Sequence, residues 1–197
     1  ASGGREVEIY RSDDGGDTWL AVSVPGMTGH ASVFAHPTIS STVYAGYSES
    51  GGLFKSEDRG LTWLTITNGL TDTQVIALAF QQTNPLVMYA GTANGNVFRS
   101  QDGGASWGFI GRPDNYVGEI VVNPFNPQEV WVCGSGIGIW GAFWKYDSGV
   151  WTQISPGSGW ENVVYSLAFD QHVSGTMWIG TQAGGFKSTN GGMNWVP

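Results

Sequence analysis

Short apolar segments alternate with turn residues along the whole chain, and the same order of segments recurs. Between residues 75 and 110 the segments read VIALAF (75–80), VMYAGT (87–92), NVFRS (96–100) and SWGFI (106–110). They are rich in β-branched and aromatic residues, and none has the 3.6-residue period of an amphipathic helix. The pattern predicts an all-β protein made of short antiparallel strands.

The predicted strands group into repeats with a constant step of 44 residues, which is set by Trp19, Trp63, Trp107, Trp151 and Trp195. Four short strands per repeat, with turns between them, are typical of the blades of a β-propeller. We therefore predict one propeller domain or segment over residues 1–197. It has a half-blade at 5–25 and blades at about 30–68, 74–111, 117–155 and 162–197.

Four of these tryptophans end a related eight-residue motif: SDDGGDTW (12–19), SEDRGLTW (56–63), SQDGGASW (100–107) and STNGGMNW (188–195). An Asp followed two positions later by Gly favours a tight turn, because the carboxylate can accept backbone N–H groups and Gly tolerates a positive φ. We predict a hairpin between the third and fourth strands of each blade, with the Trp anchoring the exit strand. Structural roles follow for the five tryptophans and for Asp14, Asp58, Asp102 and Asp147, the last in a contracted motif that ends at Trp151.

This motif resembles the Asp-box, or BNR repeat, of sialidases, xyloglucanase-type glycoside hydrolases, sortilin-like receptors and photosystem II assembly factors. The resemblance covers essentially the whole chain and implies a β-propeller. It indicates fold more than function, because the box in those families is a structural hairpin that lies away from the active face.

Composition narrows the possible partners. A net charge of −8 and a pI near 4.6 argue against binding to nucleic acid or to an anionic membrane surface. No apolar run is long enough to insert into a membrane, and the chain shows no signal peptide. The single cysteine, Cys133, is predicted to be buried and inert in the strand position of Ala45 and Ala90. Without a His or Cys cluster, we expect no metal and no cofactor.

Polar and aromatic residues in the predicted inter-blade loops and in the loops between strands two and three form the candidate binding face. Its carboxylates could serve as the acid and base of a glycoside hydrolase, although each alone also fits a solvated surface group: Glu49, Asp72, Asp114 and Glu161. Its aromatic rings could stack on sugars: Tyr47, Tyr116, Trp140 and Trp160. Trp140 could equally fold back as a lid over the core between blades.

A sialidase is excluded for this chain alone. Once the arginines of the repeats are set aside, only Arg5 and Arg112 remain, and three arginines are needed to hold the substrate carboxylate. The chain supplies only the third and fourth strands of its first blade. It therefore reads as part of a larger propeller or as a piece completed by another chain, with a five-bladed ring as the alternative.

Two functional hypotheses follow. The first is an extracellular or periplasmic module that binds oligo- or polysaccharides, either by itself or as part of a polysaccharide-acting glycoside hydrolase. The second is a non-catalytic scaffold for protein interaction or assembly.

Overall fold

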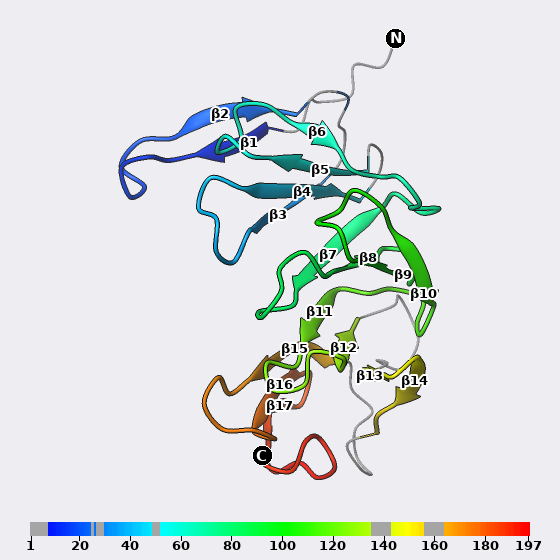
Figure 1. The fold of residues 1–197 in the computed structure, drawn as a ribbon. Coiled ribbons are helices and arrows are strands. Elements are labelled where there is room, and N and C mark those ends of the chain that lie inside the picture. The colour runs from blue at the N-terminus through cyan, green and yellow to red at the C-terminus, as the bar shows by residue number, and fades with distance from the viewer. Residues whose placement is uncertain (1–7, 25, 27–29, 49–51, 135–142, 156–163) are drawn as a thin grey trace.

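The computed structural model describes residues 8–24, 26, 30–48, 52–134, 143–155 and 164–197, and every regular element in these ranges is a β-strand (Figure 1). A two-stranded sheet pairs β1 (Glu8–Arg11) with β2 (Leu20–Ser23). The next sheet contains β3 (Ala31–Ala35), β4 (Val43–Tyr47), β5 (Leu53–Ser56) and β6 (Leu64–Thr65). It is followed by β7 (Val75–Phe80), β8 (Met88–Thr92), β9 (Val97–Ser100) and β10 (Gly108–Gly111). The fourth sheet contains β11 (Glu119–Val122), β12 (Val130–Cys133), β13 (Phe143–Asp147) and β14 (Val150–Gln153). The last contains β15 (Val164–Phe169), β16 (Met177–Thr181) and β17 (Gly184–Ser188).

The five sheets follow one another in chain order along an arc (Figure 1). The two-stranded sheet lies at one end of the arc and the β15–β17 sheet at the other, so the two ends of the chain do not meet. Each sheet is antiparallel, and its strands pair in sequence order. The predicted half-blade and four following units are confirmed. The fourth strand of the last unit is reduced to an isolated bridge between Lys187 and Val196.

The hydrophobic core lies between consecutive sheets. In the β7–β10 sheet, Leu78 and Phe98 pack in the cluster shared with β3–β6, whereas Ala79, Tyr89 and Val97 pack in the cluster shared with β11–β14. Both faces of this sheet are therefore covered. A strand that is buried on both faces reads as a continuous apolar run, which explains the sequence VIALAF.

An aromatic residue in the second strand of each repeat fills the joint to the following sheet. Tyr44, Tyr89 and Trp131 are each 1% exposed. Trp178 occupies the same register position but is 39% exposed. Trp178 is exposed because no sheet follows β15–β17 among the described residues to cover it.

The cysteine lies one register position beyond the predicted one. Cys133 pairs with Glu119 as Gly91 pairs with Ala77, so it replaces a glycine and not Ala90. It is buried, as predicted. Burial, and then the neighbouring Glu119 carboxylate, raise the pKa of the thiol. A thiol that stays protonated is a poor nucleophile, in agreement with an inert role.

The recurring motif forms the hairpin between the third and fourth strands, held by its own Ser and Asp. Ser56 Oγ donates to Asp58 Oδ1 (2.8 Å) and accepts the Gly60 amide (2.7 Å). Asp58 in turn accepts the amide (2.8 Å) and the hydroxyl (2.6 Å) of Thr62. These bonds, led by the Thr62 hydroxyl, lower the pKa of Asp58 to about 2. The same Ser-centred arrangement recurs around Asp14, Asp102 and Asn190.

Asp147 does not share this arrangement. It ends β13, and a two-residue turn, Ser148–Gly149, leads straight into β14. Both turn residues have positive φ (51° and 91°), as a type I′ hairpin requires. The Asp147 carboxylate accepts the Ser148 hydroxyl (2.9 Å). The predicted box role of Asp147 is therefore replaced by a plain hairpin.

Two of the repeat tryptophans tie neighbouring sheets together. Trp107 Nε1 donates to the Ile66 carbonyl (2.9 Å), and Trp151 Nε1 donates to the Ile110 carbonyl (2.9 Å). The other three donate instead to a glycine carbonyl of their own hairpin: Trp19, Trp63 and Trp195. Trp107 is 5% exposed, Trp63 is half-buried and Trp19 is 60% exposed. Trp107 is thus fully enclosed between two complete sheets, whereas Trp151 at the next such joint is half-buried.

Arg59 has an unfavourable backbone conformation. Its φ is +63°, whereas the equivalent positions of the other hairpins are glycines: Gly15, Gly103 and Gly191, with φ of +77°, +71° and +69°. A side chain in this left-handed region costs about 1–2 kcal/mol. The hairpin therefore retains Arg59 at a cost in stability.

We expect Trp107→Ala to lower the free energy of unfolding by about 3–5 kcal/mol, because it leaves a cavity between two sheets and an unpaired Ile66 carbonyl. Trp19→Ala, at an equivalent but exposed position, should cost less than about 1 kcal/mol. Urea denaturation of both variants measures the difference. Equal losses would contradict the assignment of Trp107 as an inter-sheet anchor.

Arg59→Gly should raise the free energy of unfolding by about 0.5–1 kcal/mol, since relief of the left-handed strain exceeds the entropy that glycine adds to the unfolded chain. Arg59→Ala is the matched control, because it removes the side chain but keeps the Cβ. A gain in stability for Arg59→Ala as large as for Arg59→Gly would show that charge, and not backbone conformation, is responsible.

Candidate functional site

The loops at the end of the sheets opposite the hairpins converge on the turn between β8 and β9. The loop before β7 contacts this turn through the Ala93 amide, which donates to the Gln74 carbonyl (2.9 Å). The loop before β11 contacts it through the Val117 amide, which donates to the Thr92 carbonyl (3.2 Å). Two loops that are far apart in sequence therefore meet one turn. We call this surface, residues 71–74, 92–96 and 112–116, the loop face.

Asp72 is the centre of the hydrogen-bond network on the loop face. Its carboxylate accepts Asn96 Nδ2 (2.8 Å), the Gln74 amide (3.2 Å) and Asn94 Nδ2 (3.3 Å). Asn94 also donates to Gln74 Oε1 (3.0 Å). The carboxylate thus fixes two asparagine side chains of the turn and the backbone of its own loop.

The protonation state of Asp72 limits its chemistry. Partial burial raises its pKa, but the hydrogen bonds from Thr92, Asn96, Gln74 and Asn94 together outweigh burial, and the net pKa is lowered. A general acid needs a raised pKa to hold its proton near neutrality. Asp72 is therefore an ionised brace or a base, and not the proton donor of a glycoside hydrolase.

Asp114 lies on the adjoining loop. Its carbonyl oxygen approaches Gly95 so closely that a Cβ at this glycine would lie 1.9 Å away. Its carboxylate accepts the Asn115 amide (2.6 Å), and Asn115 Oδ1 accepts Arg112 Nη2 (3.3 Å). The structure therefore brings the predicted candidates Asp72 and Asp114 to the same turn, and it adds exposed amides that were not predicted, those of Asn94 and Asn115.

The two described aromatic candidates differ in exposure. Tyr116 is half-buried in the loop before β11. Tyr47 is 0% exposed and packs edge-on against Phe54, with ring centroids 6.4 Å apart. Burial raises the pKa of Tyr47 to about 12. Tyr47 thus contributes to the core between sheets and offers no ring face to solvent, contrary to its predicted role in ligand binding.

The remaining predicted residues, Glu49, Trp140, Trp160 and Glu161, lie outside the described residues. Their roles stay predictions.

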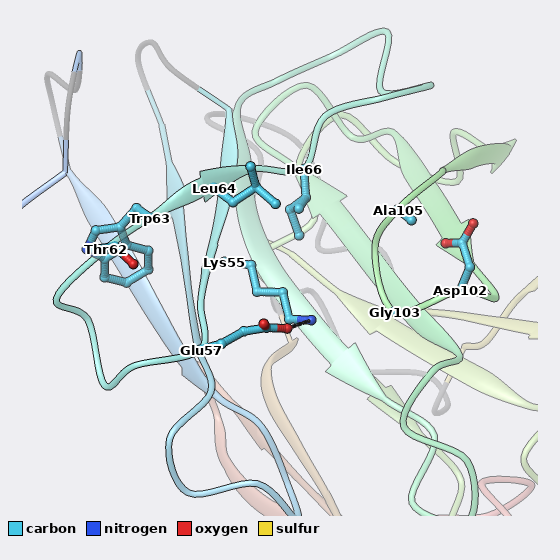
Figure 2. Close-up of a pocket in the computed structure, with 9 residues that line it drawn as sticks. All are labelled: Lys55, Glu57, Thr62, Trp63, Leu64, Ile66, Asp102, Gly103 and Ala105. Atoms are coloured by element: carbon cyan, nitrogen blue, oxygen red, sulfur yellow. Dashed lines mark ion pairs between the residues drawn. The ribbon is translucent and has the colours of Figure 1, made fainter.

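A groove crosses the hairpin side of the molecule, between the hairpins of two consecutive sheets (Figure 2). It has a volume of about 450 Å³. Figure 2 shows the ion pair of Lys55 and Glu57 (2.7 Å) projecting into it from one hairpin, with Asp102 on the other. Leu64 and Ile66 supply apolar surface.

The groove carboxylates already have partners. A hydrogen bond from Lys55 lowers the pKa of Glu57. Ser106 and Ser100 donate to Asp102 and hold its pKa at about 2. Neither group can hold a proton at neutral pH, so the groove offers contact surface and no general acid. Within the described ranges, no three His, Cys, Asp or Glu gather as a metal site, and no helix could cross a membrane.

One partly buried polar contact was missed because its register was not visible in the sequence. Glu119 reaches across to the next sheet, where its Oε2 accepts the Leu167 amide (2.9 Å), and the same oxygen accepts the thiol of Cys133 on the neighbouring strand of its own sheet (3.6 Å). The equivalent positions in other sheets hold the small residues Ser32, Ala77 and Ser166. The presence of an acidic residue at a position that is otherwise small was the sequence feature that could have indicated this contact.

Comparison with solved structures places this architecture. The chain superposes on a GH74 enzyme of Niastella koreensis with a TM-score of 0.78 at 24% identity, covering 97% of this chain and 34% of that one. For an ancestral GH74 enzyme the TM-score is 0.73 at 27% identity, and the match covers 87% of this chain and 24% of that one. For YCF48 bound to D1 peptide the TM-score is 0.68 at 17% identity, and the match covers 95% of this chain and 59% of that one. The fold is that of a β-propeller.

The chain spans about a third or less of the length of these two GH74 enzymes. No family model and no curated protein matches the sequence.

The lowered pKa of Asp72 predicts that its contribution to the stability of the fold depends on pH. A carboxylate with a folded pKa below its unfolded value stabilises the fold fully above the unfolded pKa of about 3.9, and this contribution is lost as pH falls through the folded pKa. Asp72→Asn should therefore be less stable than the parent at pH 7, and the difference should shrink below about pH 4. Denaturation between pH 2 and 7 tests this. Asp17→Asn, at an exposed hairpin position, is the control. A difference that does not change with pH would contradict the brace.

Proposed function

We propose that this chain is a carbohydrate-interacting β-propeller module, of the kind found in polysaccharide-acting glycoside hydrolases, with the loop face as its binding surface. The observation that carries the proposal is the ordered set of amides and carboxylates on the loop face, held by Asp72. Sugars are recognised by fixed donors and acceptors of this type beside aromatic rings. Likeness to GH74 enzymes, one of them a xyloglucanase from Xanthomonas campestris, supports a polysaccharide ligand.

Asn94 and Asn115 suit such a role because both side chains are exposed and both are oriented by neighbours. Asn94 Nδ2 donates to Asp72 and Gln74, and the side chain is exposed. Asn115 Oδ1 accepts a hydrogen bond from Arg112 Nη2. An amide that is already oriented loses little conformational entropy when it binds a hydroxyl.

The proposal extends to the residues outside the described ranges. Trp140 and Trp160 would supply the stacking platforms, and Glu49 and Glu161 would supply further carboxylates beside Asp72 and Asp114. An extracellular or periplasmic location is part of the same proposal, because polysaccharide ligands of this kind lie outside the cytoplasm.

A non-catalytic scaffold for protein interaction is the second candidate. The groove between hairpins favours it, because the groove combines apolar contact surface with carboxylates that already have partners. The likeness to YCF48 bound to D1 peptide shows a propeller of this shape that holds a peptide.

We expect the chain to bind xyloglucan oligosaccharides in isothermal titration calorimetry, and Asn94→Ala and Asn115→Ala each to weaken binding about tenfold, since each removes a hydrogen bond. Trp140→Ala and Trp160→Ala should weaken it at least as much. Gln101→Ala changes an exposed amide on the hairpin side and is the control. Binding that is insensitive to both asparagine variants and both tryptophan variants would refute the site, and no binding to a panel of neutral and acidic polysaccharides would refute the function.

A further inference from the structure

Arg99 lacks the carboxylate partner that its counterpart in the preceding sheet has. Arg99 and Lys55 occupy the same position, directly before the serine that begins the hairpin motif. Lys55 pairs with Glu57, two residues later, at 2.7 Å (Figure 2). The residue two positions after Arg99 is Gln101, which carries no charge. Within the described ranges no ion pair involves Arg99, so its positive charge has no ionic partner there.

The guanidinium of Arg99 is partly buried and incompletely satisfied. It lies over the ring of Tyr89, with the guanidinium carbon 5.9 Å from the ring centroid, and Tyr89 is 1% exposed. The Nε atom of Arg99 is buried, and no described residue forms a hydrogen bond with it. A buried cation is costly unless it is paired and hydrogen-bonded, and contact with a ring offsets only part of that cost. Arg99 would therefore be stabilised by an added anion.

A cavity of about 220 Å³ lies beside this guanidinium, and it is lined by residues of β9, β10 and the hairpin between them. Gly108 pairs with Arg99 in the register, at the position where Leu64 pairs with Lys55. A Cβ at Gly108 would have only the Arg99 carbonyl oxygen within 4 Å, at 3.9 Å, apart from its chain neighbours. Glycine in place of leucine thus leaves open space next to Arg99.

The neighbouring sheet does not close this cavity. Arg99 and Tyr89 lie on the face of the β7–β10 sheet that packs against β11–β14. At the preceding joint, the hairpin of the next sheet supplies a wall of the groove through Asp102 and Gly103 (Figure 2). The hairpin of β11–β14 is shortened to the turn Ser148–Gly149, and no described residue of that sheet lines the cavity. A ligand can therefore enter the cavity from solvent.

The cavity combines a cation with a hydroxyl group and an apolar wall. Ser106 is exposed, and its hydroxyl donates to Asp102 (2.5 Å). A hydroxyl that donates can still accept a hydrogen bond from a ligand. Half-buried Ile110 supplies the apolar wall. Asp102 is the single carboxylate of this hairpin, and it lines the preceding groove and not this cavity. An anion that carries hydroxyl groups on an apolar ring matches this set.

We propose that the cavity beside Arg99 binds the carboxylate of an acidic sugar, with Arg99 as its counter-charge. A guanidinium can hold a carboxylate through two parallel hydrogen bonds, which favours arginine for this task. The cavity, about 220 Å³, is smaller than the roughly 300–1,000 Å³ of sites for drug-sized ligands, so it suits one sugar residue and not a long segment. The sugar in this proposal rests on the proposed carbohydrate function, whereas the carboxylate rests on the surroundings of Arg99.

The test uses the isotopically labelled full chain and follows the backbone amide signals of Ser106 and Gly108 by NMR while sodium glucuronate is added. We expect saturable shifts of both signals, because both residues line the cavity. Glucose, added at matched ionic strength, has a similar ring without the carboxylate. It should bind about tenfold more weakly or less, through loss of the charge-assisted hydrogen bonds.

Gln101→Glu is the decisive variant, because it recreates beside Arg99 the arrangement of Lys55 and Glu57. The new carboxylate should pair with Arg99 and weaken glucuronate binding about tenfold or more. Gln101→Ala is the matched control, since it changes the same exposed side chain without adding charge and should bind as the parent does. Gly108→Leu, which copies the residue of the preceding sheet, should fill the cavity and abolish binding. Circular dichroism checks that the variants fold.

Equal affinities for glucose and glucuronate, or unchanged glucuronate binding in Gln101→Glu, would overturn the proposal. Equally tight binding of N-acetylglutamate amide would show that the cavity takes any carboxylate, and it would overturn the assignment to a sugar. Xyloglucan oligosaccharides, titrated in the same way, report on the loop face. If they do not bind while glucuronate does, the loop face fails as a carbohydrate site and the cavity beside Arg99 is supported.

Discussion

Face-to-face packing of small antiparallel sheets is the constraint on which the rest of this structure depends. A sheet of two to four short strands has too little surface to be stable alone, so each face must be covered by the next sheet along the arc. The aromatic residue of the second strand makes this cover: Tyr44, Tyr89 and Trp131 are almost completely buried between sheets. Trp178 and Val33 are exposed, although their local sequences match those of buried counterparts, because no neighbouring strands cover them in the described part of the structure. Whether a residue is buried here depends on the contact between two sheets and not on the type of the residue.

The two ends of the sheets differ in how their polar groups are arranged. At the hairpin end, serine and aspartate satisfy each other and the turn backbone, which leaves carboxylates such as Asp58 with pKa values near 2 and no proton to give. At the loop end, Asp72 accepts hydrogen bonds from the side-chain amides of Asn94 and Asn96, and Asn94 is exposed. A repeated, self-satisfied turn can be copied many times without altering function, whereas the irregular loops can vary with the ligand.

The strained residue Arg59 contacts the first strand of the structure. Arg59 keeps a left-handed backbone where other hairpins have glycine, and its carbonyl accepts Arg11 Nη1 (3.2 Å), the cation of β1. Arg11 also binds Asp13, so the guanidinium is oriented from both sides. Strain that persists in a structure commonly marks a functional position. The hairpin of the first complete sheet thus helps to orient Arg11 of the two-stranded sheet.

The sequence by itself determined the repeat, the strand order, the hairpin positions and the loop face, because each follows from local period and turn chemistry that act within about ten residues of chain. Only the tertiary structure decided which equivalent residues are buried, that Tyr47 belongs to the core, that Cys133 replaces a glycine, and that Glu119 spans two sheets. A shift of one residue in register moves a side chain to the opposite face of its sheet, and cover by a neighbouring sheet depends on residues some 44 positions away. The local sequence pattern specifies neither the register of the strands nor their cover by a neighbouring sheet, and both are decided when the sheets pack.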